Sequence, residues 1–377
     1  MGPAATESAP DTGLIAVLDE EGRPLPGAEL PELADERLIE LYGTMCLLRA
    51  IDRRLEGLQR MGRIGFFGSA RGQEAAVIGS GAAFEARDWI FPALRENGVM
   101  LLRGFSLSKY FAHMFGNRQD VLRGRMQPMH FAAREVNQVS WSSTIASQLP
   151  HAVGCAWAMK HRGDSAVAAG YVGDGGTSEP DFHAAMNFAG AWKVPVVLIC
   201  QNNQWAISVP SSRQTASQTF AIKARAYGMP GVRVDGNDLL AVYRETRRAV
   251  ERARAGSGPT FLELVTFRAG GHSSADDPTR YRDPREEERW QRRDPIARVR
   301  AHLEGRGLWD AARQEALDEE QRAALNQAVR EAEGAPPPPP LDVVEDVYAV
   351  PPPALLAQRR SLAEELRARE LGESSAR

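Results

Sequence analysis

One stretch, residues 173–203, constrains the fold of this chain more than any other. It reads GDGGTSEPDFHAAMNFAGAWKVPVVLICQNN, and an apolar run at 167–172 precedes it. That run and a second one at 194–200 have the length and composition of buried strands. The glycines after the first run break regular structure, and 179–191 has helical spacing. The pattern therefore predicts a strand–loop–helix–strand unit, which is the building block of a parallel sheet.

A polar side chain follows each predicted strand: Asp174 after the first and Asn203 after the second. Open α/β sheets bind their ligands at the carboxyl ends of parallel strands. Carboxylate and amide oxygens suit Mg²⁺, which leaves coordination positions for phosphate and water. Glycines allow a phosphate to approach backbone N–H groups. A helix-capping Asp in an ordinary turn would explain GDG alone, but GDG and NN at this spacing predict a site for magnesium and a diphosphate.

GDG followed by NN at this distance resembles the thiamine-diphosphate signature. The wider text, GDGGTSEPDFHAAMNFAGAW and QNNQWAISVP, resembles the alpha subunit of the decarboxylating first component of 2-oxo acid dehydrogenase complexes, over about residues 38–366. The resemblance implies that Asp174 and Asn203 bind Mg²⁺ and that Trp205 supplies a backbone carbonyl to the same ion. The glycines that it places around the diphosphate are Gly173, Gly175 and Gly176.

Two further segments resemble diphosphate contacts of this family. Arg95 follows a short predicted strand at 88–91 and matches an arginine that holds the diphosphate; a surface arginine paired with Glu96 is the alternative. Leu94 stands where the family has tyrosine, so a polar cofactor contact is lost there. Gln201 stands where some members carry an arginine, and its amide can donate a hydrogen bond to the diphosphate without adding charge.

The segment 140–148, SWSSTIASQ, resembles the part of the family that meets the pyrimidine ring of the cofactor. Ser143 and the Ile145 backbone would contact the ring, and the Ile145 side chain would support the bent cofactor conformation. A Ser- and Thr-rich helix start is the alternative, and we favour the cofactor role. Branched-chain members also bind potassium here, and its occupancy in this chain stays open. The matching positions are Ser142, Thr144, Ser147 and Gln148.

The segment 268–277, RAGGHSSADD, follows the last predicted strand, 259–266. An imidazole at a strand end suits proton transfer near neutral pH, although a lone histidine is more often structural. The text GHS-x-x-DD resembles the active-site loop of the family, in which His272 matches the histidine that contacts the cofactor and takes part in catalysis. Ser273 matches a serine that a kinase modifies in some animal relatives.

Strands expected near 89, 168, 195, 232 and 261 alternate with helices. This order predicts an α/β fold with a doubly wound parallel sheet flanked by helices, as in the thiamine-diphosphate-binding fold. We expect a flexible N-terminal arm at 1–34 and a cofactor- and magnesium-binding α/β domain at 35–334. A Pro-rich linker and a C-terminal helical tail are expected at 335–377.

Composition bears on partners and location. The net charge of −3 and the 25% of charged residues do not favour nucleic acid or an acidic membrane surface as a partner. Apolar runs stay shorter than a membrane span, and the N-terminal text lacks the pattern of a signal peptide. The three cysteines have no metal-binding spacing. We therefore expect a cytoplasmic protein.

The resemblance implies an oxidoreductase that decarboxylates a 2-oxo acid with thiamine diphosphate and passes the acyl group to a lipoylated acyltransferase, the second component of the complex. Activating the cofactor needs a carboxylate against its pyrimidine ring, and the family takes that Glu from a separate beta subunit. We therefore predict an α2β2 heterotetramer. NNQWAIS and GGHSSADD favour branched-chain 2-oxo acids, and pyruvate is the alternative. A transketolase-like transfer enzyme and a non-catalytic subunit are more distant alternatives.

Overall fold

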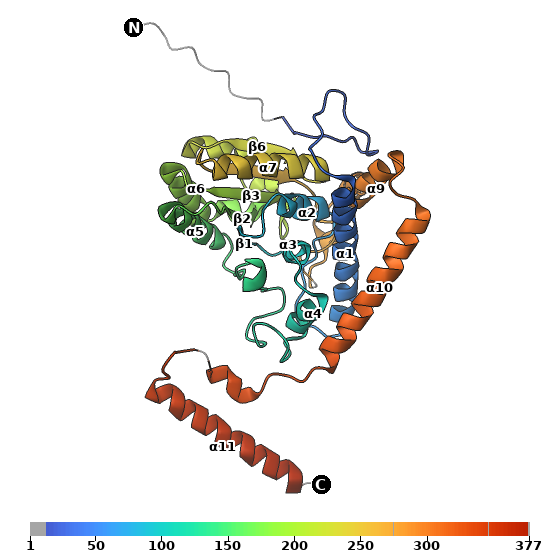
Figure 1. The fold of residues 1–377 in the computed structure, drawn as a ribbon. Coiled ribbons are helices and arrows are strands. Elements are labelled where there is room, and N and C mark those ends of the chain that lie inside the picture. Colours follow the sequence, from blue (N-terminus) through green and yellow to red (C-terminus); the bar gives the residue numbers. More distant parts are fainter. Residues whose placement is uncertain (1–12, 274, 346, 376–377) are drawn as a thin grey trace.

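The computed structural model describes residues 13–273, 275–345 and 347–375. Five parallel strands form one sheet in the order β1-β2-β3-β7-β6 (Figure 1). Two short strands, β4 and β5, form a separate antiparallel pair. The strands are β1 (Trp89–Phe91), β2 (Ala168–Gly173), β3 (Val196–Asn202), β4 (Trp205–Ala206), β5 (Val209–Pro210), β6 (Gly231–Asp235) and β7 (Thr260–Val265).

Helices surround this sheet and continue beyond it toward the C-terminus. They are α1 (Asp35–Arg60), α2 (Glu74–Ala82), α3 (Asn97–Leu102), α4 (Leu107–Phe115), α5 (Gln148–Arg162), α6 (Pro180–Trp192), α7 (Leu239–Arg254), α8 (Pro284–Gln291), α9 (Pro295–Gly305), α10 (Ala311–Gly334) and α11 (Pro353–Ser375). Within the described parts of the chain, no helix combines the length and the apolar character that crossing a membrane requires.

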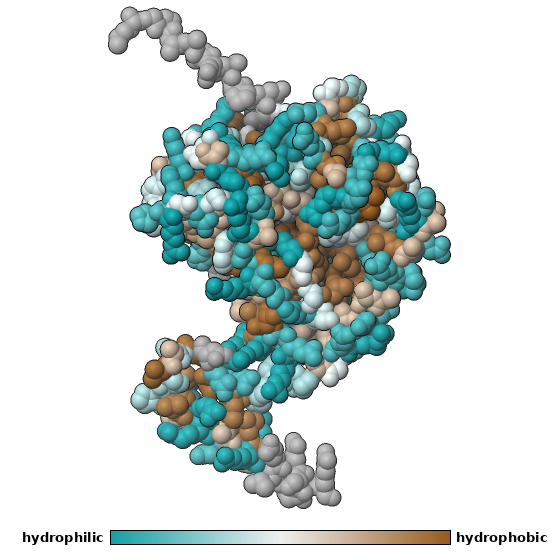
Figure 2. Space-filling view, in the orientation of Figure 1, coloured by the Kyte–Doolittle hydropathy of each residue, from teal (hydrophilic) through white to brown (hydrophobic). Residues whose placement is uncertain are grey.

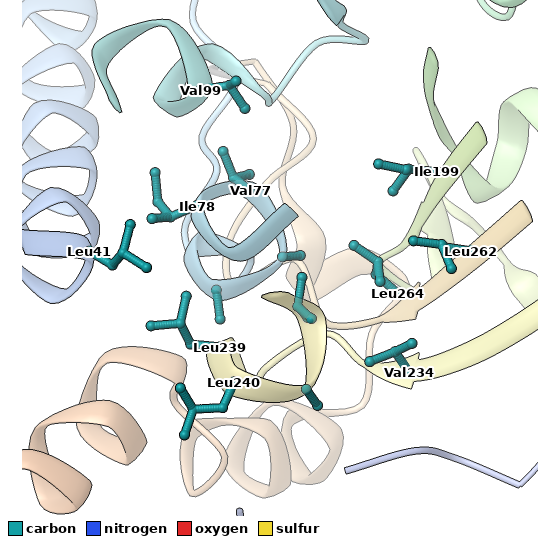
Figure 3. Packing of buried hydrophobic residues seen from close by; sticks show 14 of the residues in the cluster. Leu41, Val77, Ile78, Val99, Ile199, Val234, Leu239, Leu240, Leu262 and Leu264 are labelled. Carbon is teal, nitrogen blue, oxygen red and sulfur yellow. The ribbon is translucent and has the colours of Figure 1, made fainter. Parts of the chain in front are cut away.

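The two faces of the sheet bury different helices, because successive strand residues point to opposite sides. On one face Tyr171 and Ile199 join a core built with α1, α2 and α7, which Figure 3 shows around Val77 and Leu239. On the other face, Val172 and other even-numbered residues of β2 and β3 pack against α5 and α6 in a second core. Helices therefore cover both faces, and the predicted doubly wound parallel α/β fold is confirmed.

The pairing of β2 with β3 fixes the central edge of the sheet. The register runs from Ala168 opposite Val196 to Gly173 opposite Gln201. Both strands therefore end at the same level, and the segments that follow them, Asp174 in one and Asn203 in the other, leave the same edge. Both strands are buried almost throughout, as their continuous apolar text predicts.

The N-terminal segment differs from the flexible arm expected at 1–34. Residues 1–12 lie outside the described residues, but residues 13–34 pack on the α/β domain. Ile15 bridges to Val234 of β6, and Val17 and Leu18 are buried. Their backbone N–H groups donate to Asp238 Oδ2 at 2.6 and 2.7 Å. The apolar run LIAVL extends the edge of the sheet. The Pro- and Ala-rich residues on either side of it favour a flexible segment, so the sequence does not indicate this contact.

The C-terminal segment leaves the body of the molecule after α10. The proline-rich stretch is anchored where the Arg118 backbone N–H donates to the Pro336 carbonyl at 3.0 Å. A short 3₁₀ segment, Pro340–Val344, and α11 then stand apart from the sheet (Figure 1). Figure 2 shows hydrophobic side chains on this tail, and the exposed ones include Val343, Val347, Tyr348, Val350 and Leu356.

Asp238 should matter for stability beyond its role as a helix cap. Its Oδ1 accepts from the backbone of Leu240 and Ala241 in α7, while Oδ2 holds residues 17 and 18. We expect Asp238→Ala to lower the free energy of unfolding by about 3 kcal/mol, because buried N–H groups lose their acceptor. Urea unfolding would measure the loss, and hydrogen exchange should rise at residues 14–25.

The matched control is Asp310→Ala, which removes an exposed cap from α10. It should cost only about 1 kcal/mol and leave exchange at residues 14–25 unchanged. Equal losses in the two variants would contradict the dual role of Asp238.

Candidate active site

A cavity of about 550 Å³ opens at the carboxyl ends of β2 and β3. It is lined by segments that lie far apart in the sequence. The expected site residues that line it are Leu94, Arg95, Ser143, Ile145, Gln148, Gly173, Asp174, Gly175, Gly176, Gln201, Asn203, Trp205 and His272. Ser142, Thr144 and Ser147 belong to the same 140–148 loop but do not line the cavity.

Asp174 and Asn203 lie on this cavity wall, each directly after its strand. Asp174 is only 1% exposed, and its Oδ2 has no hydrogen-bond partner among the described residues. Burial raises the pKa of this carboxyl to about 6, although nearby backbone N–H groups and Arg268 act in the opposite direction. A buried carboxylate oxygen without a partner is costly, and a bound cation would compensate it.

The donor set suits magnesium better than a transition metal. The described residues contain no group of three or more His, Cys, Asp and Glu side chains that could hold an ion. Magnesium commonly takes only one or two protein carboxylates and completes its shell with phosphate oxygens and water. Asp174 with the Asn203 amide fits that requirement.

Gln73 is a site residue that sequence reasoning did not single out. It is fully buried at the start of α2, and its Oε1 accepts from Asn203 Nδ2 at 3.2 Å and from Gln201 Nε2 at 3.4 Å. These bonds orient both amides. Gln73 Nε2 and Gln201 Oε1 have no partner in the described parts of the chain, and both residues line the cavity. In the sequence, GQE at 72–74 is also what a loop followed by a helix cap would show, so the text alone does not indicate this role.

Arg95 and His272 also line the cavity, and they contact each other there. Arg95 is 6% exposed, donates to the Ser69 carbonyl, and donates to the His272 carbonyl at 2.9 Å. Its Nη2 lies 3.4 Å from His272 Nδ1. The alternative of a surface arginine paired with Glu96 is wrong, since Glu96 accepts from the Ala93 backbone instead.

Positive charge is concentrated behind this contact. Arg268 donates to the carbonyls of Trp205 and Ile207 at 3.2 and 2.8 Å, and Arg282 donates to the Arg268 carbonyl at 2.7 Å. Burial, and then the neighbouring Arg268, lower the pKa of Arg95 to about 10. The pKa of Arg282 is lowered to about 10 for the same two reasons. This buried cationic cluster favours an anion in the cavity.

The Trp205 carbonyl, expected to bind magnesium, therefore already accepts a hydrogen bond from Arg268. A carbonyl oxygen has two lone pairs, so the two roles are compatible. Arg268 itself opens the quoted loop segment, but only the folded chain shows that it reaches back to the residues after β3.

The 140–148 loop is shaped by local bonds. Ser143 Oγ lies 2.9 Å from His130 Nε2, and Ser147 Oγ donates to the Thr144 carbonyl at 2.7 Å. Ser147 precedes α5 without a side-chain cap, so a plain helix-cap role does not explain it. Gln148 donates to the Tyr171 carbonyl, and its Oε1 is buried without a partner among the residues described.

The three glycines Gly173, Gly175 and Gly176 differ in the space that surrounds them. A Cβ at Gly173 would meet no atom within 4 Å, so the backbone there borders open space. A Cβ at Gly175 would lie 2.6 Å from the Ala206 Cβ, and one at Gly176 would lie 2.5 Å from Val172 Cγ2. Packing within the protein itself therefore requires glycine at the last two positions, while Gly173 keeps the cavity wall free.

This fold and this wall of acid, amide and buried arginine suit a cation together with an anionic ligand. The family model described as "Dehydrogenase E1 component" matches residues 42–341. The chain is 41% identical over 343 residues to 2-oxoisovalerate dehydrogenase subunit alpha 2, mitochondrial, of Arabidopsis thaliana, covering 91% of this chain and 73% of that protein. It is 39% identical over 354 residues to the 2-oxoisovalerate dehydrogenase subunit alpha, mitochondrial, of Bos taurus, covering 94% and 78%.

Pyruvate dehydrogenase E1 component subunit alpha of Staphylococcus aureus is similar to the same degree. It is 40% identical over 346 residues, which cover 92% of this chain and 91% of the bacterial one. The chain therefore belongs to the dehydrogenase E1 component family, as an alpha subunit of the 2-oxo acid dehydrogenase type.

His272 should be neutral in the ligand-free chain across the physiological range. Burial, and then the neighbouring Arg95 and Arg268, lower its pKa to about 4. Since this value lies below the ordinary 6.5, acidification between the two favours the unfolded state, in which the imidazole takes up a proton more readily. We expect NMR of the ¹⁵N-labelled imidazoles, with His272→Gln to assign the signal, to show no protonation at pH 6. An imidazolium signal at that pH would contradict this electrostatic account.

Proposed function

We propose that this chain holds thiamine diphosphate through magnesium and serves in the oxidative decarboxylation of a 2-oxo acid. Membership in the E1 family implies use of thiamine diphosphate. The observation that carries the magnesium assignment is the buried, unpartnered Oδ2 of Asp174 beside Asn203 on one cavity wall. Asp174, the Asn203 amide and the Trp205 carbonyl would hold the ion.

Each remaining residue has a task that its surroundings support. Bound thiamine diphosphate would supply the electron sink on which loss of CO₂ from a 2-oxo acid depends. Arg95 supplies positive charge toward the diphosphate, with Gly173 keeping the wall open and Gln201 offering an amide. Arg95 and Asp276 hold the backbone of His272, which keeps its side chain at the cavity. In its neutral form the imidazole can accept or donate a proton there.

The ring end of the cofactor would lie against the 140–148 loop. Ser143 and the Ile145 backbone would contact the pyrimidine ring. Leu94, beside Arg95, stands where the family has tyrosine and would give the cofactor no polar contact. We also assign the potassium ligands of branched-chain relatives to Ser142, Thr144, Ser147 and Gln148. Support comes from the buried Gln148 Oε1, which lacks a partner in the described chain.

A beta subunit is required to complete this site. Ile145 and Ile207, which line the cavity, are 46% and 55% exposed, so the mouth is open and apolar. Such side chains at a cavity mouth suit burial against a partner chain. We propose an α2β2 heterotetramer in which the beta subunit supplies the activating carboxylate, and a lipoylated acyltransferase as acceptor of the acyl group. We also propose a cytoplasmic location, on the sequence pattern alone.

Branched-chain 2-oxo acids are the proposed substrates, on the strength of the NNQWAIS and GGHSSADD segments. Pyruvate is the second candidate, favoured by the bacterial relative that matches over 91% of its own length. The similarity to both kinds of relative is equal within two per cent identity, so it does not separate them. All of these relatives are dehydrogenase subunits, which gives the transketolase-like alternative no support.

Asp174→Ala should abolish magnesium-dependent binding of thiamine diphosphate. The variant removes the carboxylate that follows β2 and lines the cavity together with Asn203. Trp141 and Trp205 line the cavity, so quenching of tryptophan fluorescence in the chain co-purified with its beta subunit would report binding. Asp181→Ala, on α6 outside the cavity, is the matched control and should bind normally. Retained magnesium-dependent binding in Asp174→Ala would remove this residue from the metal site.

Substrate preference should follow the branched-chain motifs. With the chain and its beta subunit, we expect kcat/KM for branched 2-oxo acids to exceed that for pyruvate by at least about tenfold, or about 1.4 kcal/mol in the barrier. The measurement is decarboxylation of both substrates side by side with thiamine diphosphate and Mg²⁺. A preference for pyruvate would overturn the substrate proposal and leave the cofactor assignments intact.

A further inference from the structure

A second cavity, of about 710 Å³, lies between α1, α9 and α10 and shares no lining residue with the candidate active site. These three helices lie side by side in Figure 1. Five arginines and two aspartates provide all of its charged lining. They are Arg49, Arg53, Arg54, Arg300, Arg322, Asp294 and Asp318.

The charged groups of this cavity are unequally paired. Three arginines have carboxylate partners within 3 Å: Arg49 with Glu74 and Asp294, Arg300 with Glu304, and Arg322 with Glu319. Both lining acids accept hydrogen bonds, Asp294 also from the first turn of α9 and Asp318 from Gln314 Nε2 at 2.8 Å. Arg53 and Arg54, by contrast, form no ion pair or hydrogen bond in the described structure.

Two guanidinium N–H groups of the cavity are also buried without an acceptor. They are Arg49 Nη2 and Arg54 Nε, which have no partner among the described residues. A buried donor without an acceptor costs roughly 1–3 kcal/mol. Arg53 follows Arg49 by one helical turn, where like charges destabilise a helix. The cavity therefore holds two arginines, Arg53 and Arg54, that have no carboxylate partner among the described residues.

We propose that this cavity binds a phosphate-bearing small molecule through Arg53 and Arg54, with Arg49 Nη2 as a further donor. Two unpaired guanidinium groups match the charge of a phosphate monoester, which is close to −2 at neutral pH. The planar fork of arginine binds phosphate oxygens in pairs. The volume falls within the range of about 300–1,000 Å³ that small-molecule sites occupy, which favours a metabolite over a protein segment.

This inference is independent of the proposed reaction, because neither arginine lines the cofactor cavity. The test uses the chain co-purified with its beta subunit, with saturating thiamine diphosphate and Mg²⁺, titrated with glycerol 3-phosphate and followed by ³¹P NMR line broadening. Glycerol serves as the uncharged control ligand. We expect saturable binding of one phosphate ester per chain, weakening as salt is added.

The variant that decides is the double substitution Arg53→Gln with Arg54→Gln, which should weaken binding at least tenfold. Arg60→Gln is the matched control, since Arg60 lies on the same helix, pairs with Glu56 and does not line the cavity. Arg95→Gln tests for binding at the other cavity and should leave the affinity unchanged. Should the double variant fail to fold, Arg53→Gln alone alters an exposed side chain and should still weaken binding about threefold.

Four results would overturn the proposal. Three of them are the absence of saturable binding, equal affinity in the wild type and the folded double variant, and loss of binding in Arg95→Gln instead. Binding of glycerol as tightly as its phosphate ester would do the same, because the charge would then play no part.

Discussion

The parallel pairing of β2 with β3 is the constraint from which the rest of the site follows. Its register ends with Gly173 opposite Gln201, so the chain leaves both strands at one level and places Asp174 and Asn203 on one wall. Buried strands hold their register firmly, because a slip of one residue would turn every side chain to the other face. Gly170 contributes to this fit, since a Cβ there would lie 3.0 Å from Leu198 Cδ2. Packing thus fixes the edge on which the chemistry depends.

Electrostatics then make the cavity specific for a charged ligand. Burial and the neighbouring Arg268 lower the pKa of Arg95 and of Arg282, while Asp174 is buried without a partner for one oxygen among the described residues. Both arrangements are costly by themselves, because like charges repel and desolvated charges lose hydration. The proposed pair of a cation and a diphosphate would compensate both costs together. The two arrangements therefore favour the pair over either ion alone.

The sequence predicts those features of the fold and the site that depend on short continuous segments. The strands around 167–203 are continuous apolar runs and the helix between them has helical spacing. The resemblance placed residues as distant as Arg95 and His272 in one site, where the structure also brings them together. It missed Gln73, whose importance arises only when α2 meets the ends of β3. It also missed the packing of residues 13–34, because their anchor, Asp238, lies more than two hundred residues away. Both failures concern long-range contacts of short segments with ordinary composition.

The open mouth of the cavity explains why a chain of this family works with a partner. Water that reaches the cavity screens Arg95 and His272 from the reacting groups, and charge stabilisation is far stronger in a site that excludes water. The exposed Ile145 and Ile207 at this mouth provide apolar surface that a second chain can cover. Covering it would bury these side chains and raise the strength of the electrostatic interactions in one step. The proposed division of the site between two chains would therefore couple assembly to activity, so that the cofactor is activated only in the assembled enzyme.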